Sequence, residues 1–320
     1  MLCFQAKFSG VIMKFIDLFS GIGGFHLAFH KLGHECVFAS EIDKHARMTY
    51  ETNLRSLSPS LFSERKFNDD IRKITNPETQ IPDFDILCAG FPCQPFSQAG
   101  QKRGFNEQKD DRGNMFFNIC SVIEAKKPKA FFLENVRNII SHDNGKTFKM
   151  IEKTIKEDLG YSFFYKIVKA SDHGLPQHRA RAFMVGFRNG ENSELPEFEF
   201  PTSEPLQLTM SDVWGGECNK KIGYTLRVGG KGSGIHDRRN WDAYLVDGIE
   251  RRIGIKEGLM MMGFPDNYQF PVSNTQALKQ LGNSVAINSV QATAKKITKY
   301  LEENNEFFNQ KHLLDKNKVA

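Results

Sequence analysis

Hydrophobic and polar positions follow two alternating patterns along the first part of the chain. Lys14–Leu18 is mostly apolar after its first residue, which predicts a buried strand. Residues 21–24 interrupt this run with three glycines, residues 25–32 continue with helical spacing, and residues 34–40 return to strand character. The pattern therefore predicts one β-α-β unit near the start of the chain.

The same alternation continues to residue 187. Further strands are expected at residues 85–87, 130–133, 161–168 and 181–187, with helices at Met115–Lys126 and residues 147–158. Strands joined by crossover helices form a parallel sheet with helices packed on it. We therefore expect an α/β fold with a doubly wound, mostly parallel sheet.

The composition changes after this region. Residues 191–205 are rich in Glu, Pro and Ser and predict a linker. Residues 210–254 are glycine-rich and basic, whereas a helical pattern resumes at residues 285–301. We expect a first domain at residues 1–209, with residues 283–320 packing back onto it, and a smaller domain with a hinge at residues 210–282.

The overall composition narrows the class of protein only slightly. A chain of 320 residues with 40% hydrophobic content can bury a substantial core. The formal net charge of +5 suits a polyanionic partner without proving one. Because no apolar run is long enough to cross a bilayer and the start has no secretory pattern, we expect a cytoplasmic protein.

The six cysteines are scattered along the chain. None forms a two-residue-spaced pair, and no paired histidines lie nearby, so we expect no metal site. In a reducing cytoplasm they are free thiols, one of which is a candidate for chemistry.

The glycine loop is a candidate cofactor site. Phe19, Gly21, Gly23 and Gly24 follow a predicted strand and open a helix, where glycine lets a ligand approach the backbone closely. Glu41 ends the next predicted strand, about twenty residues on, where a carboxylate can accept both ribose hydroxyl protons. A tight turn without a ligand and a solvated acid are the alternatives.

Two details decide between nucleotide-like cofactors. His26 stands where a dinucleotide fingerprint has its third glycine, which weakens a dehydrogenase interpretation. S-adenosylmethionine has a sulfonium cation and no phosphate, and Phe19 is a favourable neighbour for a cation. Ile42, Asp70 and Ile71 are further candidates for cofactor contacts, and Asp70 is expected to bind the adenine amino group. From its local sequence alone, Asp70 would be interpreted as a turn residue.

Cys93 is the candidate nucleophile. It lies between Pro92 and Pro95, just past the carboxyl end of a predicted strand, where open α/β sheets bind ligands. Cys88, inside that strand, is expected to be an inert buried thiol.

Five ordered motifs resemble those of the bacterial DNA cytosine-5 methyltransferases of restriction-modification systems. They are residues 19–24, Pro92-Cys93-Gln94, Glu134-Asn135-Val136, residues 177–181 and Gly282-Asn283-Ser284. The resemblance extends from about residue 14 to residue 300. It implies the sheet of the class I S-adenosylmethionine-dependent methyltransferases, with Asn283 and Ser284 in the cofactor site and double-stranded DNA as the substrate of a monomeric enzyme.

The chemistry explains why these residue types occur together. Carbon 5 of cytosine becomes nucleophilic only after a thiolate, here that of Cys93, adds to carbon 6. The resemblance assigns Glu134, with a pKa raised by burial, to ring nitrogen 3 and the exocyclic amine. Arg179 and Arg181 alternate along a predicted strand and are expected to present two guanidinium groups to the base carbonyl and a nearby phosphate or carboxylate. Asn135 and Asn283 are expected to position loops.

The target base must leave the duplex before a thiolate can reach it. Residues 94–112, including Gln94 and Ser97, are polar and correspond in the family to a loop that closes over DNA. Surface disorder is the alternative.

Residues 210–254 are expected to choose the DNA sequence. The candidate readers are Thr225, Arg227, Arg238 and Arg239. A solvated basic surface is the alternative interpretation. Residues 252–265 resemble part of a family motif, but Lys256 stands where the motif usually has an arginine. We therefore assign no functional role to these residues.

Three rival functions remain after this comparison. An RNA cytosine methyltransferase has the same catalytic parts, but its Cys-Phe-Thr signature is absent from this sequence. An inactive DNA-binding module is disfavoured by the intact Cys93, Glu134, Arg179 and Arg181. A nicotinamide-dependent dehydrogenase is the third rival, and cofactor binding distinguishes it. We expect a short GC-rich palindrome as the target and a cognate restriction nuclease.

Overall fold

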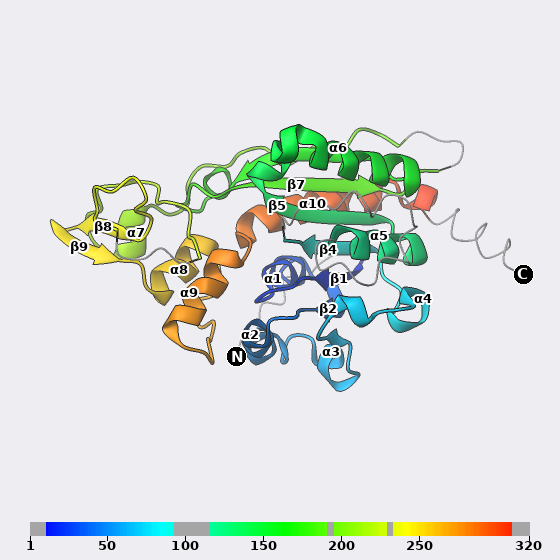
Figure 1. Cartoon of the computed structure of the whole chain (residues 1–320), viewed down its shortest axis with the longest axis horizontal. Helices are drawn as coiled ribbons and strands as arrows, with labels where there is room; N and C mark the ends of the chain where they lie inside the picture. The colour runs from blue at the N-terminus through cyan, green and yellow to red at the C-terminus, as the bar shows by residue number, and fades with distance from the viewer. Residues whose placement is uncertain (1–10, 93–114, 191–194, 229–232, 309–320) are drawn as a thin grey trace, which may run out of the picture.

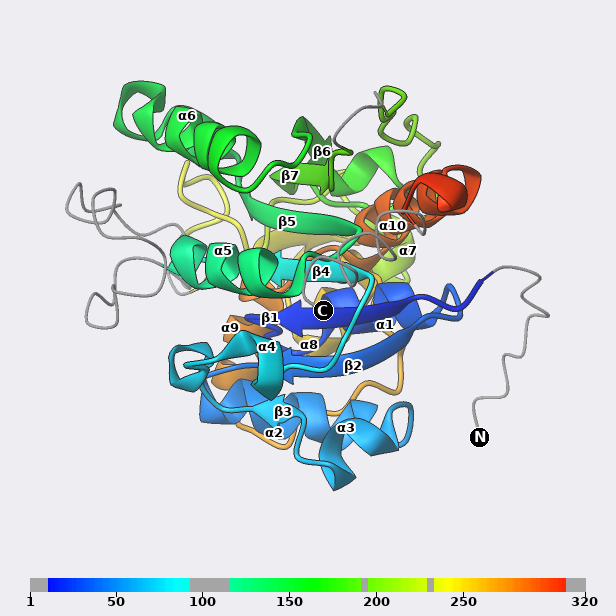
Figure 2. The ribbon, with the colours of Figure 1, turned by 90° about the vertical axis from the view of Figure 1, so that its right-hand side faces the viewer.

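The computed structural model describes residues 11–92, 115–190, 195–228 and 233–308 (Figure 1). These residues build a seven-stranded sheet in the order β3-β2-β1-β4-β5-β7-β6, which Figure 2 shows from bottom to top. Its strands are β1 (Lys14–Leu18), β2 (Glu35–Ser40), β3 (Phe67–Asn68), β4 (Ile86–Gly90), β5 (Ala130–Val136), β6 (Phe164–Lys169) and β7 (Ala180–Phe187). The strands from β3 to β5 pair in parallel, and β7 runs antiparallel to β5 and β6. The mostly parallel sheet is therefore confirmed.

The chain reverses its course across the sheet at β1. It passes from β1 to β2 and β3 on one side and then returns to β4 and β5 on the other. The loops after β1 and β4 consequently diverge at the carboxyl ends of two neighbouring strands, where open α/β sheets bind ligands. The glycine loop and the segment leading to Cys93 both begin at this point.

Helices cover both faces of the sheet. The helices are α1 (Gly24–His30), α2 (Lys44–Leu54), α3 (Pro59–Ser63), α4 (Pro77–Gln80), α5 (Met115–Lys126), α6 (Lys146–Lys153) and α10 (Ile287–Glu303). Phe15 of β1 packs in one core with α1, α2 and α10, whereas Ile16 packs in a second core with α5 and α6. Because successive strand residues point to opposite faces, one strand supplies both cores. The doubly wound arrangement is confirmed.

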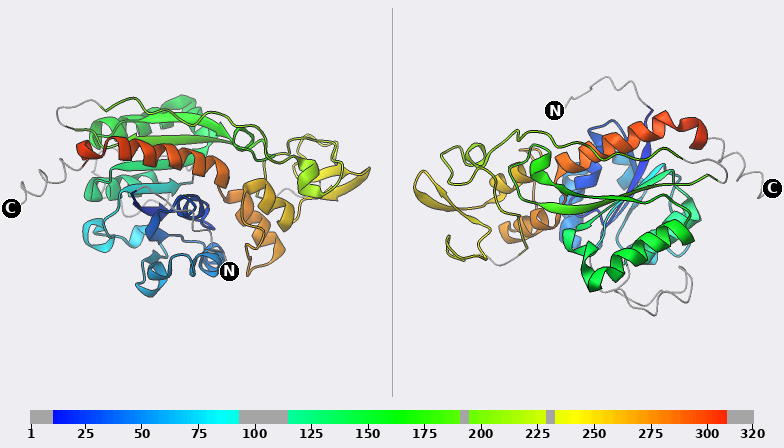
Figure 3. Two further views of the ribbon diagram at one scale, coloured as in Figure 1. Left: turned by 180° about the vertical axis from the view of Figure 1, so that it is seen from behind. Right: turned by 90° about the horizontal axis from the view of Figure 1, so that it is seen from above.

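The carboxyl-terminal helix returns to the first sheet. α10 packs against α1 along the back of the molecule (Figure 3). Residues 195–200 pack there as well, because Tyr300 Oη donates a hydrogen bond to the Pro196 carbonyl at 2.6 Å and Phe198 is buried against Phe187. This part of the expected linker is therefore fixed to the core, and residues 191–194 lie outside the described ranges.

The segment between residues 210 and 283 forms a smaller unit beyond the carboxyl ends of the parallel strands (Figures 1 and 3). It contains α7 (Met210–Trp214), the hairpin strands β8 (Ala243–Val246) and β9 (Ile249–Arg252), α8 (Ile255–Met262) and α9 (Asn274–Asn283). The sequence pattern predicted none of these elements. They are short, and their apolar residues pack against distant parts of the chain rather than repeating along one face.

Several element boundaries differ from the sequence prediction, and two of these differences lie between residues 154 and 164. The helix expected at residues 147–158 is α-helical only to Lys153 and continues as a π-helix over Thr154–Asp158. The strand expected from residue 161 begins at Phe164. Gly160 has a φ of 71°, and this left-handed turn redirects the chain before the strand starts.

Candidate active site and cofactor pocket

Two adjoining cavities open at the carboxyl ends of β1, β2, β4 and β5. Their volumes are about 380 and 360 Å³. Both are bordered by Phe19, Glu41, Ile42 and Pro92, so they form one site with two compartments. The larger, which also contacts Glu134, is the Glu134 compartment, and the smaller, which contacts Ile71, is the Ile71 compartment.

The glycine loop after β1 has an unusual backbone. Phe19 has a φ of 55°, a left-handed conformation that few non-glycine residues adopt. Gly21 also has a φ of 55°, and the space where its Cβ would stand contains no atom within 4 Å. The loop therefore leaves open space beside its main chain and directs Phe19 along both compartments.

Gly23 and Gly24 have a different role from Gly21. A Cβ on Gly23 would lie 2.4 Å from Leu54 Cδ1, and one on Gly24 would lie 2.5 Å from Val285 Cγ2. Neither residue borders the two compartments. Both glycines therefore permit close helix packing, and the cofactor contact expected of them stays a prediction.

His26 is buried behind the glycine loop. Its ring nitrogens lie 2.6 Å from Tyr50 Oη and 2.9 Å from Ser58 Oγ. Burial lowers the pKa of His26 to about 3, so the ring is neutral at physiological pH. The position that a dinucleotide fingerprint reserves for glycine is occupied by a packed and hydrogen-bonded side chain.

Glu41 connects the glycine loop to α2. Its Oε2 accepts a hydrogen bond from the Gly21 N–H at 2.8 Å, and its Oε1 accepts one from the Asp43 N–H at 2.8 Å. Burial raises the pKa of Glu41 above its ordinary value, and these two bonds oppose the shift. Each oxygen retains a lone pair for a ligand hydroxyl. Ile42, 60% exposed, presents an apolar surface to both compartments.

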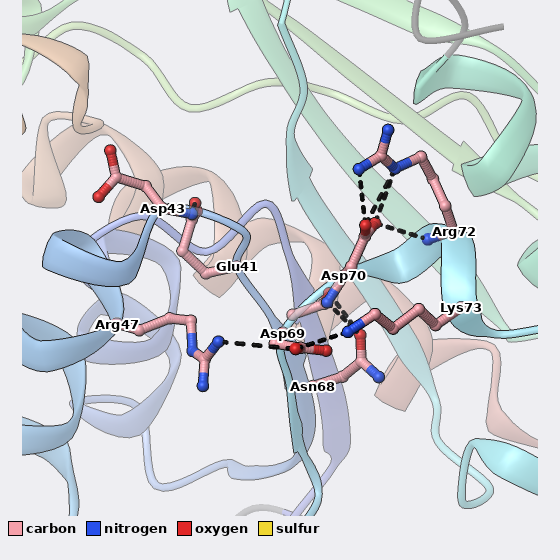
Figure 4. Close-up of polar contacts among 9 residues, drawn as sticks. Glu41, Asp43, Arg47, Asn68, Asp69, Asp70, Arg72 and Lys73 are labelled. Atoms are coloured by element: carbon pink, nitrogen blue, oxygen red, sulfur yellow. Dashed lines mark hydrogen bonds and ion pairs between the residues drawn. The ribbon is translucent and has the colours of Figure 1, made fainter.

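Asp70 is less available than the sequence suggested. It borders the Ile71 compartment, but both carboxylate oxygens accept hydrogen bonds from the Arg72 side chain, the shortest at 2.6 Å from Nη2 (Figure 4). This pairing lowers the pKa of Asp70. The adenine contact expected of Asp70 must therefore share a carboxylate that Arg72 already occupies. Ile71 is buried against the compartment as expected.

Glu134 and Arg181 form an ion pair on neighbouring antiparallel strands. Arg181 Nε lies 2.8 Å from Glu134 Oε1, and both side chains border the Glu134 compartment. Burial raises the pKa of Glu134, although the guanidinium groups of Arg181 and Arg179 oppose the shift. The raised pKa agrees in direction with the sequence-based expectation.

Arg179 uses its guanidinium differently. Its Nη atoms donate to the carbonyl oxygens of Leu226 at 3.3 Å, Gly282 at 3.0 Å and Ser284 at 2.5 Å. Burial lowers the pKa of Arg179 to about 9. Arg179 and Arg181 do border one compartment, but Arg179 is bound to main-chain carbonyls, so the expectation of two guanidinium groups presented to a substrate holds at most for Arg181.

Asn135 connects β5 to the segment that leads to the candidate nucleophile. Its Nδ2 donates to the Phe91 carbonyl at 2.9 Å. The expected loop-positioning role of Asn135 agrees with this contact. Cys93, Gln94 and Ser97 lie outside the described residues. Asn283 and Ser284 border the Glu134 compartment.

One wall of the Glu134 compartment was not predicted from the sequence. Gln276, Lys279, Gln280 and Asn283 border it from one face of α9, at the i, i+3, i+4 and i+7 spacing of a helix. A helical-face count over residues 274–283 would have found this polar stripe. Helical spacing is the only sequence signal for this wall, because Gln276, Lys279 and Gln280 belong to none of the motifs identified above.

The segment around α9 is bonded to the first domain. Tyr268 Oη donates to the Ile22 carbonyl in the glycine loop. Asn53 and Gln269 exchange two hydrogen bonds, each 2.8 Å long, and Thr49 Oγ1 donates to Gln280 Oε1 at 2.9 Å. The glycine loop and α2 therefore rest on residues that come more than 200 positions later.

The candidate DNA-reading residues lie in the smaller unit. Thr225 Oγ1 donates to the His178 carbonyl at 2.6 Å, which anchors the segment that continues to Arg227. Arg239 forms an ion pair with Asp237 at 2.7 Å. Arg227 and Arg238 are exposed and have no hydrogen-bond or ion-pair partner for their side chains within the described residues.

The described ranges contain neither a membrane-spanning helix nor a metal-binding group of side chains. No helix there is long and apolar enough to span a membrane. In the same ranges, no group of three or more His, Cys, Asp or Glu side chains is placed to hold a metal ion.

Comparison with known proteins gives matches over most of the chain. The family described as C-5 cytosine-specific DNA methylase matches residues 13–229 and 220–299. The type II methyltransferase M.HhaI of Haemophilus parahaemolyticus is 38% identical over 321 residues, covering 88% of this chain and 93% of the relative. The type II methyltransferase M1.ScrFI of Lactococcus lactis subsp. cremoris is 41% identical over 327 residues, covering 91% and 79%.

Solved structures share the fold at lower identity. A putative DNA modification methyltransferase encoded within an Escherichia coli prophage superposes with a TM-score of 0.67 at 20% identity, covering 90% of this chain and 99% of that chain. A Spodoptera frugiperda DNMT2 structure gives a TM-score of 0.65 at 20% identity, covering 89% and 99%. This likeness concerns the architecture alone.

Proposed function

Since this chain belongs to the C-5 cytosine-specific DNA methylase family, we propose that it methylates carbon 5 of cytosine in a short double-stranded sequence, through base flipping and a covalent adduct on Cys93. The coarser statement follows from the family itself: the chain is a DNA (cytosine-5-)-methyltransferase of the type II restriction-modification class, which uses S-adenosylmethionine. The observation that carries the finer proposal is the buried Glu134–Arg181 pair beside Pro92, one residue before Cys93.

The residues around the two compartments suit S-adenosylmethionine. Ile71 and the exposed Ile42 offer apolar contacts for a flat ring, and Phe19 offers an aromatic face to a sulfonium. Glu41 retains acceptor capacity for ribose hydroxyl groups, and the open main chain at Gly21 admits a ligand. Asn283 and Ser284 offer polar contacts at the border of the Glu134 compartment. When bound, S-adenosylmethionine supplies the methyl group that the activated carbon 5 accepts.

Glu134 and Cys93 would activate the base together. The Cys93 thiolate forms a bond to carbon 6, and the ring electrons move toward carbon 5 and nitrogen 3. A protonated Glu134 holds a hydrogen bond to nitrogen 3 and limits the charge that develops there. Once carbon 5 carries the methyl group, a base removes its proton, the double bond between carbons 5 and 6 re-forms, and the carbon–sulfur bond breaks to release the thiolate. The raised pKa of Glu134 supports the protonated form that this step needs.

Arg181 would orient both partners. Its Nε is bonded to Glu134, which leaves other N–H groups of the guanidinium for the carbonyl oxygen of the base. A base in a duplex cannot reach this depth, so it must rotate out of the helix first. Gln94 and Ser97 are proposed to contact the DNA at this stage, within a closing loop over residues 94–112.

Residues 210–282 are proposed to select the target, while residues 1–209 and 283–320 hold cofactor and chemistry. Exposed arginines make bidentate hydrogen bonds to guanine in the major groove, which gives Arg227 and Arg238 a route to base recognition. Methylation would then protect a short GC-rich site from a cognate restriction nuclease. The monomeric state on DNA and the cytoplasmic location expected from the sequence stay predictions.

One experiment tests reaction, substrate and target together. A plasmid is incubated with the protein and S-adenosylmethionine, and bisulfite sequencing then maps protected cytosines. We expect protection at every copy of one short sequence and none with Cys93→Ser. A parallel incubation with RNA addresses the rival substrate. Protected cytosines in RNA alone, or none in either nucleic acid, would contradict the proposal.

A further inference from the structure

Two chain segments meet at the Arg179 guanidinium. One contains Leu226, whose carbonyl accepts from Nη1 at 3.3 Å. The other contains Gly282 and Ser284, whose carbonyls accept from Nη2 at 3.0 and 2.5 Å. Arg179 is only 2% exposed, so these carbonyls take the place of water around the cation. One side chain therefore joins segments that lie 47 and 103–105 positions away in the sequence.

The first segment is fixed to the residues that immediately precede Arg179. The His178 N–H donates to the Gly223 carbonyl at 2.9 Å, and the Gly223 N–H donates to the Pro176 carbonyl at 2.9 Å. Gln177 Oε1 accepts from the Leu226 N–H at 3.1 Å. Residues 223–226 thus run beside residues 176–179, immediately before the exposed Arg227.

The two segments also touch each other. A Cβ on Gly282 would lie 2.7 Å from the Arg227 carbonyl oxygen and 3.3 Å from the Val228 nitrogen. Gly282 and Ser284 also border the Glu134 compartment. A shift of the segment at Arg227 is therefore opposed by the same atoms that line the proposed cofactor site.

The charge of Arg179 is what makes this arrangement favourable. Three carbonyl oxygens point toward one place, and their negative ends repel one another unless a cation lies between them. The planar guanidinium offers several N–H groups in a fixed geometry, so it can bond to both segments at once. A lysine at this position would keep the positive charge but would lack the planar set of N–H groups that bonds to both segments.

We propose that Arg179 is a positioning residue that couples target binding to cofactor binding, by holding residues 223–227 and the Gly282–Ser284 loop in one arrangement. The inference rests on the proposed function, since it assumes that DNA contacts Thr225, Arg227, Arg238 and Arg239 and that S-adenosylmethionine occupies the compartments. Coupling of this kind is reciprocal: DNA tightens cofactor binding by the factor by which cofactor tightens DNA binding.

The test compares cofactor affinity with and without DNA. Calorimetry measures the Kd of S-adenosylhomocysteine alone and with a saturating duplex that contains the target sequence. We expect DNA to lower this Kd by about 5-fold or more in the wild-type protein, within the range usual for allosteric coupling. In Arg179→Gln the ratio of the two Kd values should fall to near 1.

Arg181→Gln is the matched control. The substitution removes a guanidinium from the same compartment, but Arg181 is paired with Glu134 and does not join the two segments. It should lose methyl transfer and keep the wild-type ratio of Kd values. Arg179→Lys should give an intermediate ratio, and it replaces Arg179→Gln in the test if the latter does not fold, as judged by thermal unfolding.

The outcomes separate the two proposals. A wild-type ratio in the Arg179 variants, or a ratio of 1 in the wild-type protein, overturns the coupling role while leaving DNA methylation intact. A fall in the ratio with both Arg179→Gln and Arg181→Gln also overturns it, because the effect would then belong to the compartment in general. Failure of the wild-type protein to bind S-adenosylhomocysteine or to methylate DNA instead contradicts the proposed function.

Discussion

Glu134 on β5 and Arg181 on β7 are diagonal neighbours, since Glu134 pairs with Phe183 and Arg181 with Val136. Arg181 Nε lies 2.8 Å from Glu134 Oε1, and both side chains are largely withdrawn from water. The pair combines two opposed effects on one carboxyl. Burial favours its protonated form, and the adjacent cation favours its charged form. Because burial is the larger effect, the carboxyl remains a proton donor at a pH where an exposed glutamate is ionised.

This balance predicts a pH dependence of methyl transfer. The active form of Glu134 carries a proton, so its contribution to kcat/KM is present below its pKa and is lost as the pH rises through that value, which lies above the ordinary 4.5. Glu134→Gln should lower kcat by about 10²–10⁴-fold and remove this limb of the profile. The measurement is kcat/KM against pH for the wild-type protein and the variant. If kcat/KM of the variant still falls at the same pH, the titration belongs to a group other than Glu134.

Cys93→Ser should abolish methyl transfer and leave the affinity for S-adenosylhomocysteine nearly unchanged. The thiolate is needed for addition to carbon 6, whereas Phe19 and Glu41 belong to the cofactor pocket. A duplex with 5-fluorocytosine at the target should trap a denaturation-resistant adduct, because fluorine cannot leave carbon 5 as a proton does. An adduct that persists in Cys93→Ser would identify a different nucleophile.

Glu41→Gln should weaken S-adenosylhomocysteine binding by about 10-fold or more, as expected for the loss of hydrogen bonds to a charged acceptor. The amide would also place an NH₂ group against the N–H of Gly21 or Asp43, each of which now donates at 2.8 Å. Glu35→Gln, at an exposed position on β2, is the control and should bind normally. Equal effects of the two substitutions would assign the loss to general electrostatics.

Arg238→Ala should relax discrimination at one position of the DNA target, at a cost of about 1–3 kcal/mol for a lost base contact. Arg239→Ala should affect the target less, because Asp237 already binds its guanidinium and that pairing lowers the pKa of Asp237 to about 2. Methylation is measured on targets carrying every single-base change. A uniform loss across all targets would make both arginines phosphate contacts.

The sequence predicted the parts of the fold that depend on local periodicity. Lys14–Leu18 and Met115–Lys126 have the predicted bounds, because an apolar run or an amphipathic stripe is visible within a few residues. The smaller unit was not predicted in detail. Its elements are short, and packing with distant residues, such as that of Gly258 against Leu281, determines their form.

The candidate site shows the same division. Glu134 and Arg181 were identified from their motifs, and the register of β5 and β7 brings them together. The partners of Arg179 were not predictable, because main-chain carbonyls leave no trace in residue type. The engagement of Asp70 by Arg72 was also missed, since neighbouring charges two positions apart do not reveal whether they pair.

The bond from Tyr268 to the Ile22 carbonyl joins residues 246 positions apart, and the Asn53–Gln269 pair spans 216. The glycine loop is synthesised early, whereas Tyr268 and Gln269, which bond to it and to α2, are synthesised late. A ribosome must release most of the chain before the pocket can assume its final form, so partial chains that end before α9 should be unable to retain the cofactor. The enzyme thus becomes competent to bind its methyl donor only when the part proposed to select DNA has also been made.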